Sequence, residues 1–298
     1  MASPDNTDPP FPESPVLPQT FGEDHAIRFR CHRGVSCWNA CCSNIDISLT
    51  PYDIVRLKQR LDLSSTDFLE QYTVPYEMEK GGIAGVKLKP VEGGTACRFM
   101  RPEGCGVYED RPTACRYYPV ALLSMRKEGE ATDRDSFALV VEPHCRGHDE
   151  PRPISIADYR AEQGLPEYDD CARGWRQLIL KKKSSGPTIG SPSKRSLQLF
   201  FMTCYDVDRF RAFVASEGFA EIHDVPADEL AAVQADDVAA LQFGFRFLRQ
   251  VLFGEASIPL REGNVEERRA RVAAQRARLE REAAERVARD EEPEDDDE

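Results

Sequence analysis

The feature that most constrains this chain is the clustering of its cysteines. Ten cysteines occur in 298 residues, and eight of them lie between positions 31 and 145. Four of the eight precede residue 43, three lie from 97 to 115, and the last is at 145. They are Cys31, Cys37, Cys41, Cys42, Cys97, Cys105, Cys115 and Cys145. Scattered core cysteines do not cluster in this way, so the fold must bring several sulfurs together for a purpose.

The N-terminal sequence predicts a cytoplasmic protein. MASPDNTDPPFPESPVLPQ is acidic and rich in proline, whereas a secretory signal needs a positive start and an apolar stretch. No run of 18 apolar residues occurs, so we expect no membrane span. Because cytoplasmic thiols stay reduced, we expect metal binding, and disulfides are the weaker alternative.

Thiolates are the ligands of soft divalent metals and of iron–sulfur clusters, and one tetrathiolate site needs four of them. The eight clustered cysteines would satisfy two such sites, or one site with cysteines left for redox work. Neighbouring side chains point apart in extended backbone, which favours dividing Cys41 and Cys42 between two sites, although one metal could take both. His32, His144 and His148 could each replace a thiolate, or lie outside the ligand shell.

The second cysteine segment carries a longer motif. It reads CRF from Cys97, GCGVY from Gly104, RP from Arg111 and CRYYP from Cys115. With the earlier CC pair and the LTPYDIVRLK that follows it, this pattern resembles the YkgJ-type cysteine-cluster family, or CxxCxxCC, a zinc- or iron-chelating domain. The resemblance covers about residues 25–150 and implies metal chelation. Flagellin lysine methylases carry a similar cysteine domain, so a modification enzyme stays open.

The opening of the cluster departs from the commonest spacing of that family. Five residues separate Cys31 from Cys37, and three separate Cys37 from Cys41. Whether Cys31 and Cys37 bind the same centre is therefore open.

Two arginines flank one of the expected ligands. Arg111 and Arg116 lie on either side of Cys115, where a cation would offset thiolate charge and tune the potential of a metal site. The alternative is a surface salt bridge with Glu109 or Asp110.

Two cysteines outside the cluster are expected to be spare. Cys171 falls near the predicted start of a helix at about Asp169, where the helix N-terminus would lower a thiol pKa. Cys204 lies in the apolar run LFFMTCYDV and is expected to be buried.

The chain is predicted to be an α+β protein with irregular cysteine-rich loops, a small hairpin or sheet, surrounding helices and a helical C-terminal half. Helices are expected to begin after Thr50 and Ser155, and paired strands to span 120–125 and 137–142. The predicted parts are a disordered acidic, proline-rich tail (1–24), a metal-binding domain (25–183), a linker or mobile loop (184–196), a helical segment packing on that domain (197–260), and a charged helix with an acidic tail (261–298).

The formal charge of −13 comes entirely from the two tails. Residues 1–24 carry five acidic and no basic side chains, and residues 290–298 carry eight acidic ones. No basic footprint for nucleic acid or anionic lipid is present. No glycine-rich nucleotide loop occurs either.

We therefore predict a cytoplasmic protein that chelates iron, as an iron–sulfur cluster in one version, or zinc. A redox or protein-modification role is open, and so is a zinc scaffold without catalytic activity. The C-terminal helices could dock a protein partner. Whether the chain is an enzyme, and through which residues, is not decided by the sequence.

Overall fold

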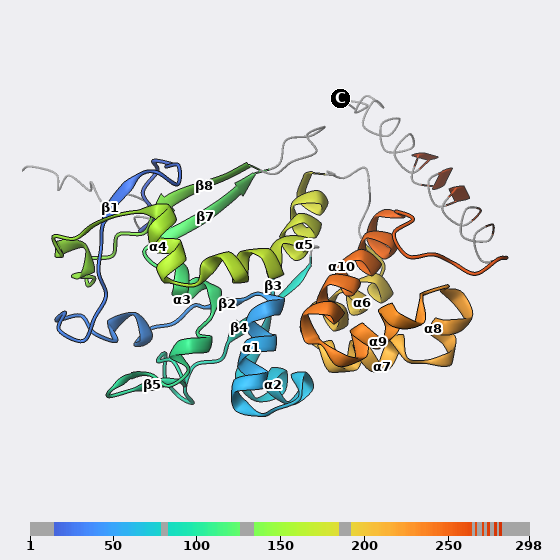
Figure 1. Cartoon of the computed structure of the whole chain (residues 1–298), viewed down its shortest axis with the longest axis horizontal. Coiled ribbons are helices and arrows are strands. Elements are labelled where there is room, and N and C mark those ends of the chain that lie inside the picture. The colour runs from blue at the N-terminus through green and yellow to red at the C-terminus, as the bar shows by residue number, and fades with distance from the viewer. Residues whose placement is uncertain are drawn as a thin grey trace, which may run out of the picture. The chain divides into compact units, whose positions relative to one another are not determined.

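The computed structural model describes residues 15–78, 83–125, 134–184 and 192–263, together with scattered positions between 266 and 281. Helices alternate with small antiparallel sheets and dominate the C-terminal half, which confirms the predicted α+β class. The described chain forms two compact units (Figure 1). Unit 1 consists of 15–47, 90–125 and 134–167, and unit 2 of 48–78, 83–89 and the residues from 168 onward. This division differs from the continuous metal-binding domain 25–183 expected from the sequence.

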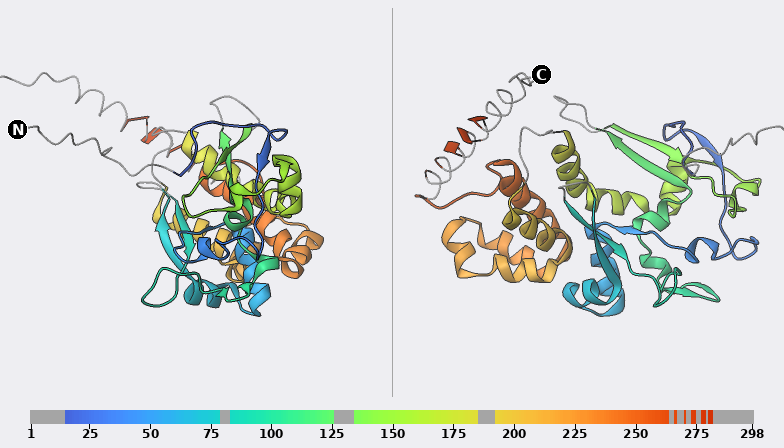
Figure 2. Two further views of the ribbon diagram at one scale, coloured as in Figure 1. Left: turned by 90° about the vertical axis from the view of Figure 1, so that its left-hand side faces the viewer. Right: turned by 180° about the vertical axis from the view of Figure 1, so that it is seen from behind.

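Unit 1 is built from short elements. In chain order these are β1 (Ala26–Arg28), η1 (Ala40–Cys42), β5 (Met100–Arg101), β6 (Gly104–Cys105), η2 (Tyr108–Asp110), α3 (Thr113–Tyr117), β7 (Val120–Met125), β8 (Arg134–Leu139), η3 (Gly147–Asp149), β9 (Pro153–Ser155) and α4 (Ile156–Glu162). Three antiparallel pairs join β1 to β9, β5 to β6 and β7 to β8, and the β7–β8 pair is drawn in green in Figures 1 and 2.

The apolar core of unit 1 is a small cluster. It consists of Ile27, Phe29, Tyr117, Val120, Phe137, Ile154, Ile156, Tyr159 and Leu165. Its members come from β1, β7, β8, β9 and the helices beside them, and none of the eight clustered cysteines belongs to its buried centre. Cys145 packs against the edge of this cluster, and Cys97 is buried elsewhere in unit 1.

Residues 15–24, which the sequence assigned to a disordered tail, instead lie along β8. The Phe21 N–H donates to the Phe137 carbonyl at 2.7 Å, and the Phe137 N–H returns a bond to Phe21 at 2.9 Å. The Leu17 N–H also donates to the Leu139 carbonyl at 2.8 Å. The edge of β8 presents backbone donors and acceptors that need partners, and this segment satisfies them. Residues 1–14 lie outside the described part of the chain.

Local sequence signals locate the starts of α1 (Pro51–Leu61) and α4 and the strand β7. Thr50 caps α1: its Oγ1 accepts from the Asp53 N–H at 3.1 Å, and the Asp53 carboxylate accepts from the Thr50 N–H at 2.8 Å. Ser155 caps α4 as expected. The strand predicted at 120–125 is β7, whereas its partner begins earlier than predicted, at Arg134, because Val120 pairs with Leu139.

Unit 2 combines a three-stranded sheet with helices. The strands are β2 (Ser48–Leu49), β3 (Thr73–Glu77) and β4 (Ala84–Leu88), with β4 in the centre. Besides α1, the helices are α2 (Ser65–Tyr72), α5 (Leu165–Ser184, which starts in unit 1), α6 (Lys194–Tyr205), α7 (Val207–Val214), α8 (Glu217–Ile222), α9 (Ala227–Ala235) and α10 (Asp237–Phe253).

Aromatic side chains fill the helical core of unit 2. The Phe210 ring lies 6.1 Å from that of Phe247 on α10, and Phe213 lies 5.4 Å from Phe219 on α8. Helices α6 and α10 pack closely at Gly244, where an added Cβ would come within 2.5 Å of Thr203 Cγ2. The absence of a side chain at this glycine allows the close approach.

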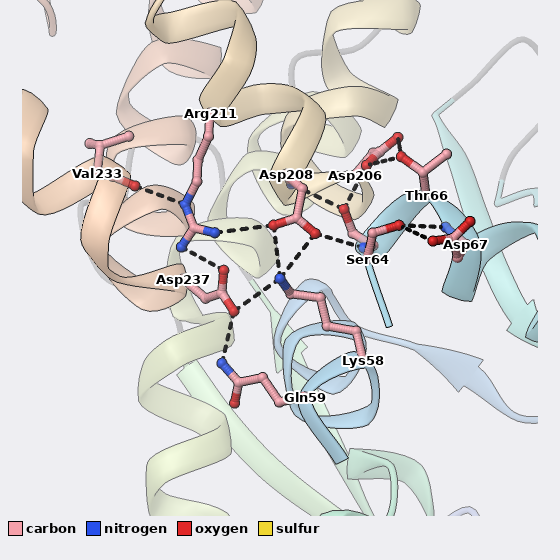
Figure 3. Close-up of polar contacts among 11 residues, drawn as sticks. Lys58, Gln59, Ser64, Thr66, Asp67, Asp206, Asp208, Arg211, Val233 and Asp237 are labelled. Carbon is pink, nitrogen blue, oxygen red and sulfur yellow. Dashed lines mark hydrogen bonds and ion pairs between the residues drawn. The ribbon is translucent and has the colours of Figure 1, made fainter. Parts of the chain in front are cut away.

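A charged network joins α1 to α7 and α10 within unit 2 (Figure 3). Lys58 Nζ lies 2.9 Å from an Asp208 oxygen and 3.2 Å from an Asp237 oxygen. Arg211 completes the network with contacts of 3.1 Å to Asp208 and 2.6 Å to Asp237. Two cations thus face two carboxylates, so that each of these mostly buried charges has opposite partners.

Helices α2 and α7 cap each other. The Ser65 N–H donates to Asp208 at 2.7 Å, and the Asp208 N–H donates to Ser65 Oγ at 3.0 Å. Ser65 Oγ also donates to Asp206 at 2.6 Å. Two helix N-termini therefore share their capping groups, which satisfies donors that each helix leaves unpaired.

The remaining predicted segments are only partly described. Residues 185–191 of the expected linker and most of 261–298 lie outside the described residues. In the part of the chain that the structure describes, no helix is long and apolar enough to span a membrane.

Candidate metal centre

All eight cysteines predicted as ligands lie in unit 1. Cys31 and Cys37 precede η1, Cys41 and Cys42 lie in it, Cys97 precedes β5, Cys105 ends β6, Cys115 lies in α3, and Cys145 precedes η3. All ten cysteines of the chain are free thiols. The cysteines therefore lie on loops and short elements. Backbone hydrogen bonds, more than a packed core, hold these segments in place.

Hydrogen bonds join the two cysteine segments of the chain. The Cys97 N–H donates to the Cys42 carbonyl at 2.7 Å, although 54 residues lie between them in the sequence. Asn39 Nδ2 donates to the Arg101 carbonyl at 2.9 Å. These bonds place the turn of Cys41 and Cys42 beside the hairpin that carries Cys105.

Cys41 and Cys42 lie in a 3-10 turn, not in extended backbone. The Cys42 N–H donates to the Asn39 carbonyl at 2.9 Å, and Asn39 opens the turn in the left-handed conformation (φ 66°). The two thiols hydrogen-bond to each other. The expectation that the neighbouring side chains point apart is therefore wrong, because it assumed strand geometry where the chain forms a turn.

The hairpin of β5 and β6 depends on Gly104. Its φ of 130° is a conformation that L side chains rarely adopt, and an added Cβ would lie 2.9 Å from Trp38 Cζ2. Met100 pairs with Cys105, and Arg101 pairs with Gly104. Gly104 thus fixes the point at which Cys105 leaves the hairpin.

The environment of Cys31 identifies its neighbours. The pKa of this thiol is raised to about 11, although the residue as a whole is exposed. Desolvation by the surrounding chain is the largest cause, the thiols of Cys41, Cys37 and Cys145 add to it, and the Arg111 charge offsets part of the increase. Cys31 therefore lies within electrostatic range of three other cysteines.

Cys42 has a different set of neighbours. Its hydrogen bond with Cys41 raises the pKa of Cys42, and burial and the thiols of Cys41, Cys97 and Cys115 add to this increase. The same bond lowers the pKa of Cys41 to about 7. Cys41 is thus the preferred site of deprotonation in the pair, because Cys42 donates its S–H to the Cys41 thiolate.

Cys97 and Cys105 share Cys41 as an electrostatic neighbour. Burial raises the pKa of Cys97, with contributions from Cys105 and Cys41. Burial also raises the pKa of Cys105, while the charges of Arg111 and Arg101 lower it. These two cysteines therefore share the surroundings of the Cys41–Cys42 pair.

Backbone N–H groups donate to two of the sulfurs. Phe99 N–H donates to Cys97 Sγ at 3.4 Å, and Arg146 N–H donates to Cys37 Sγ at 3.2 Å. Such bonds stabilise thiolates and are typical of the surroundings of metal-bound sulfur. Among the described residues, however, no three His, Cys, Asp or Glu side chains are arranged so as to hold a metal ion. The described geometry therefore does not itself form a metal site, and a site built from these cysteines requires them to rearrange.

A family model covers this whole arrangement. Residues 30–146 match the CxxCxxCC family model. That family is described as "Putative zinc- or iron-chelating domain", and the matched range contains all eight clustered cysteines. The match confirms the predicted resemblance and the predicted choice of iron or zinc. No match was found among curated proteins or among solved structures.

The three histidines in or just after the CxxCxxCC region, His32, His144 and His148, have other partners. His32 Nδ1 accepts from the Gly34 N–H at 3.1 Å, and its Nε2 lies 3.4 Å from Glu150. His148 Nε2 lies 3.1 Å from the Val140 carbonyl. His144 Nε2 faces Glu142 at 3.7 Å. These contacts favour supporting roles for the three rings over a place among the ligands.

Arg116 acts on the backbone near the cysteines. Its Nε donates to the Arg111 carbonyl at 3.1 Å, one terminal nitrogen donates to the Gln163 carbonyl at 2.6 Å, and the other to the Glu109 carbonyl. The side chain is 6% exposed. Arg116 therefore links η2, α3 and the end of α4, and its contact with Glu109 is made through a carbonyl.

The two spare cysteines lie outside the CxxCxxCC region, in unit 2. Cys204 is 1% exposed on α6, as expected for a packing residue. Cys171 does not lie at a helix start, because α5 begins at Leu165 and already includes Cys171 in its second turn. The expected position of Cys171 at a helix N-terminus is therefore wrong.

Tyr118 lies at the edge of the cysteine region. It packs against the apolar cluster of unit 1. Burial raises its pKa, and hydrogen bonding to the Cys145 and Glu142 side chains raises it further. Only the fold shows that Tyr118 lies beside Cys145, because 26 residues separate the two in the sequence.

Proposed function

We propose that the eight cysteines of unit 1 hold zinc or iron in two adjacent four-thiolate groups. The Cys31 group consists of Cys31, Cys37, Cys41 and Cys145. The Cys42 group consists of Cys42, Cys97, Cys105 and Cys115. The observation that carries this division is the set of electrostatic neighbours: Cys31 has the other members of its group, and Cys42 has two members of its own group besides Cys41.

Cys41 lies at the junction of the two groups. Its thiol is hydrogen-bonded to Cys42 and raises the pKa of Cys31, Cys97 and Cys105. Adjacent residues in one turn are the natural link between two centres, since each can serve one of them. Cys41 and Cys42 therefore serve different groups, as the sequence suggested. The reason is that they share one turn at the junction of the two groups, and not that their side chains point apart.

Uptake of metal by these thiols would release protons. Thiolates are the ligand form, and most of the thiols whose pKa departs from its ordinary value have it raised, so that metal and protons compete for the sulfurs. Zinc bound here would supply a structural cross-link. An iron–sulfur cluster would supply a one-electron carrier.

An iron–sulfur or iron centre with a redox or protein-modification role in the cytoplasm is the first candidate. It is supported by the number of thiols and by N–H groups that donate to sulfur. Structural zinc in a scaffold is the second candidate. It is supported by the loops and short turns that carry most of the cysteines, because a metal cross-link orders such segments.

Anaerobic purification of the full chain separates these candidates. Iron, zinc and acid-labile sulfide are measured per chain, and the absorption spectrum is recorded. Iron and sulfide with visible absorption support the first candidate. A colourless protein with stoichiometric zinc supports the second and overturns the first. A metal-free protein that takes up neither metal on reconstitution overturns both.

Paired substitutions test the division into groups. Cys31→Ser with Cys145→Ser removes two donors from the Cys31 group, and Cys97→Ser with Cys115→Ser removes two from the Cys42 group. Each double variant should lose about half of the bound metal, because four donors make one tetrathiolate site. Cys171→Ser is the matched control and should keep the full load. Loss of all metal from either double variant would show one shared centre instead of two.

A further inference from the structure

Unit 2 gathers basic side chains at one end of its helices. Lys181, in the last turn of α5, forms an ion pair with Glu255, which follows the end of α10. The Lys181 Nζ also lies 4.9 Å from the centre of the Phe253 ring at the end of α10. Arg249 on α10 donates to Gln177 Oε1 on α5 at 2.7 Å. The last turns of α5 and α10 therefore lie side by side.

Helix α6 begins at the same end of unit 2. Near the end of α6, Thr203 lies against Gly244 of α10. Just beyond α6, Asp208 shares the cation Lys58 with Asp237, the first residue of α10. The two helices are therefore antiparallel. Nine residues lead back from Thr203 to the start of α6, and nine lead on from Gly244 to the end of α10, so at about 1.5 Å per residue these two helix ends lie at a similar level.

The three helix ends carry a concentrated positive charge. Residues 177–184, 194–198 and 249–255 contain six basic side chains and one acidic side chain, a formal charge of +5. All six basic side chains are exposed or partly exposed. They define the basic face of unit 2: Lys181, Lys182, Lys183, Lys194, Arg195 and Arg249. Like charge gathered at an accessible surface attracts an anion.

The cations at the start of α6 are not explained by the helix itself. Its first turn contains Lys194 and Arg195 and no acidic residue. A helix N-terminus carries a partial positive charge, so cations there are unfavourable. By contrast, α1 and α10 have Asp53 and Asp237 in their first turns. The two cations of α6 therefore fit the binding of an anion better than a role in stabilising the helix.

The chain contains an anionic segment of matching charge. Residues 290–298, which lie outside the described part of the chain, read DEEPEDDDE and carry a formal charge of −8. Glu255 contacts the basic face, and Gly263 follows it by eight residues, so the two are at most about 30 Å apart. Asp290 follows Gly263 by 27 residues, enough to span about 40 Å even as a continuous helix. The acidic segment can therefore reach the basic face of its own chain.

We propose that the acidic segment 290–298 binds back onto the basic face of unit 2 in its own chain. A tethered segment is present at an effective concentration of about 1 mM, which favours it over the same segment of another copy and over nucleic acid. Each exposed ion pair contributes little by itself and is weakened by salt, so the contact depends on several pairs and opens readily. The basic face is thus an anion-binding surface that the chain covers with its own acidic segment.

Cross-linking of the full-length chain tests this contact directly. A carbodiimide activates carboxylates, and a lysine amine in contact with an activated carboxylate forms an amide with it. At low salt, mass spectrometry should find amides that join 290–298 to Lys182, Lys183 or Lys194. Lys89, an exposed lysine of unit 2 outside the basic face, is the matched control and should give few links. At about 1 M salt, where screening limits charge interactions to about 3 Å, the links to the basic face should disappear.

A mixture of unlabelled and isotope-labelled chains shows which chain supplies the acidic segment. Links within one isotopic species support the proposal. Links mainly between the two species would assign the segment to a second copy and would overturn it. Links to Lys89 as frequent as those to the basic face would show unspecific contacts and would also overturn it.

Peptide binding gives a quantitative test. A fluorescent peptide of sequence DEEPEDDDE is titrated into full-length wild type and into a neutral-tail variant, which has Asn for Asp and Gln for Glu at all eight acidic positions of 290–298. The neutral-tail variant should bind the peptide about tenfold more tightly than wild type, because its own segment no longer competes for the basic face. Equal affinity of the two proteins would contradict the proposal.

Removal of charge from the basic face completes the test. In the neutral-tail variant, Lys182→Gln, Lys183→Gln and Lys194→Gln together should weaken peptide binding about tenfold, because three exposed pairs of ordinary strength are lost. Lys89→Gln should leave it unchanged, and equal losses would contradict the proposal. If the triple variant does not fold, as judged by circular dichroism, the comparison of wild type with the neutral-tail variant still decides. A DNA duplex bound equally well by those two proteins would show that the acidic segment does not cover the basic face.

Discussion

Unit 2 is stabilised by buried side chains, whereas the cysteine loops of unit 1 are stabilised mainly by backbone hydrogen bonds. In unit 2, Phe200, Phe210 and Leu241 are fully buried among the helices. In unit 1, Cys31 and Cys41 are exposed, and bonds such as Cys97 N–H to Cys42 O position the loops. Bound metal would give the cysteine loops a further source of order, because metal binding to thiolates contributes directly to folding.

The two units also use charge differently. In unit 2, Lys58 and Arg211 are matched by Asp208 and Asp237 within one network (Figure 3). In unit 1, the hydrogen bonds described for Arg111 go to the uncharged oxygens of Tyr108 and Gln163. Charges in unit 2 therefore hold helices together, whereas the Arg111 side chain joins neutral groups.

The two tryptophans allow each unit to be followed separately. Trp38 lies in unit 1 and Trp175 in unit 2. Trp38→Phe leaves the fluorescence of unit 2, and Trp175→Phe leaves that of unit 1. The predictions below use these single-tryptophan backgrounds.

Metal removal should have the largest effect, and it should fall on unit 1. A chelator under reducing conditions should cost unit 1 several kcal/mol, because metal binding to a site that does not persist in the unfolded chain contributes directly to folding. Hydrogen exchange should show lost protection around Cys42 and Cys105, with protection kept in α6 and α10. Equal loss of protection in both units would contradict the difference between them.

Lys58→Met should have the next largest effect, and it should fall on unit 2. It leaves Asp237 and Asp208 with one cation in place of two, and breaking a buried ion pair costs about 3 kcal/mol. Urea unfolding followed through Trp175 measures this cost. The control is Lys181→Met, whose partner Glu255 is partly exposed; it should cost less than about 1 kcal/mol. If Lys58→Met and Lys181→Met lower the free energy of unfolding by similar amounts, burial of the network does not determine its contribution to stability.

Gly104→Ala should destabilise the cysteine hairpin by about 2 kcal/mol, because an unfavourable φ and a close contact with Trp38 combine. Thermal unfolding of unit 1, together with metal content, measures the effect. Gly93→Ala is the matched control: its φ is also positive (68°), but nothing lies within 4 Å of the added Cβ. Gly93→Ala should therefore cost less and leave the metal load intact, and the reverse order would contradict the role given to Gly104.

The pH dependence of unit 2 should show the smallest effect. Burial alone would raise the pKa of Asp208, but hydrogen bonds from Lys58 and from the Ser65 N–H outweigh it and lower the pKa. The stabilisation is therefore complete above the unfolded pKa of about 4 and is lost as the pH falls through the lower folded value. Urea midpoints between pH 6 and pH 3, read through Trp175, should fall less steeply in Asp208→Asn than in wild type. If the urea midpoints of wild type and Asp208→Asn fall equally steeply with pH, a contribution from Asp208 is excluded.

Local signals in the sequence predicted much of the fold and the chemistry of the candidate site. Thr50 and Asp53 form the capping box that starts α1, because the interacting groups lie three residues apart. The RPTACRYYP segment and the cysteine spacing identified a zinc- or iron-chelating domain, because ligand type and spacing are properties of the chain itself.

Tertiary structure decided what depends on the path of the chain. The turn that brings the Cys41 and Cys42 thiols together needs a left-handed Asn39, and the bond from Cys97 to Cys42 joins residues far apart in sequence. The contact of Lys58 with Asp208 spans 150 residues. Capping, periodicity and ligand chemistry act over a few residues and can be read from the sequence. The neighbours of a buried charge or thiol are set by long-range packing, so only the folded chain identifies them.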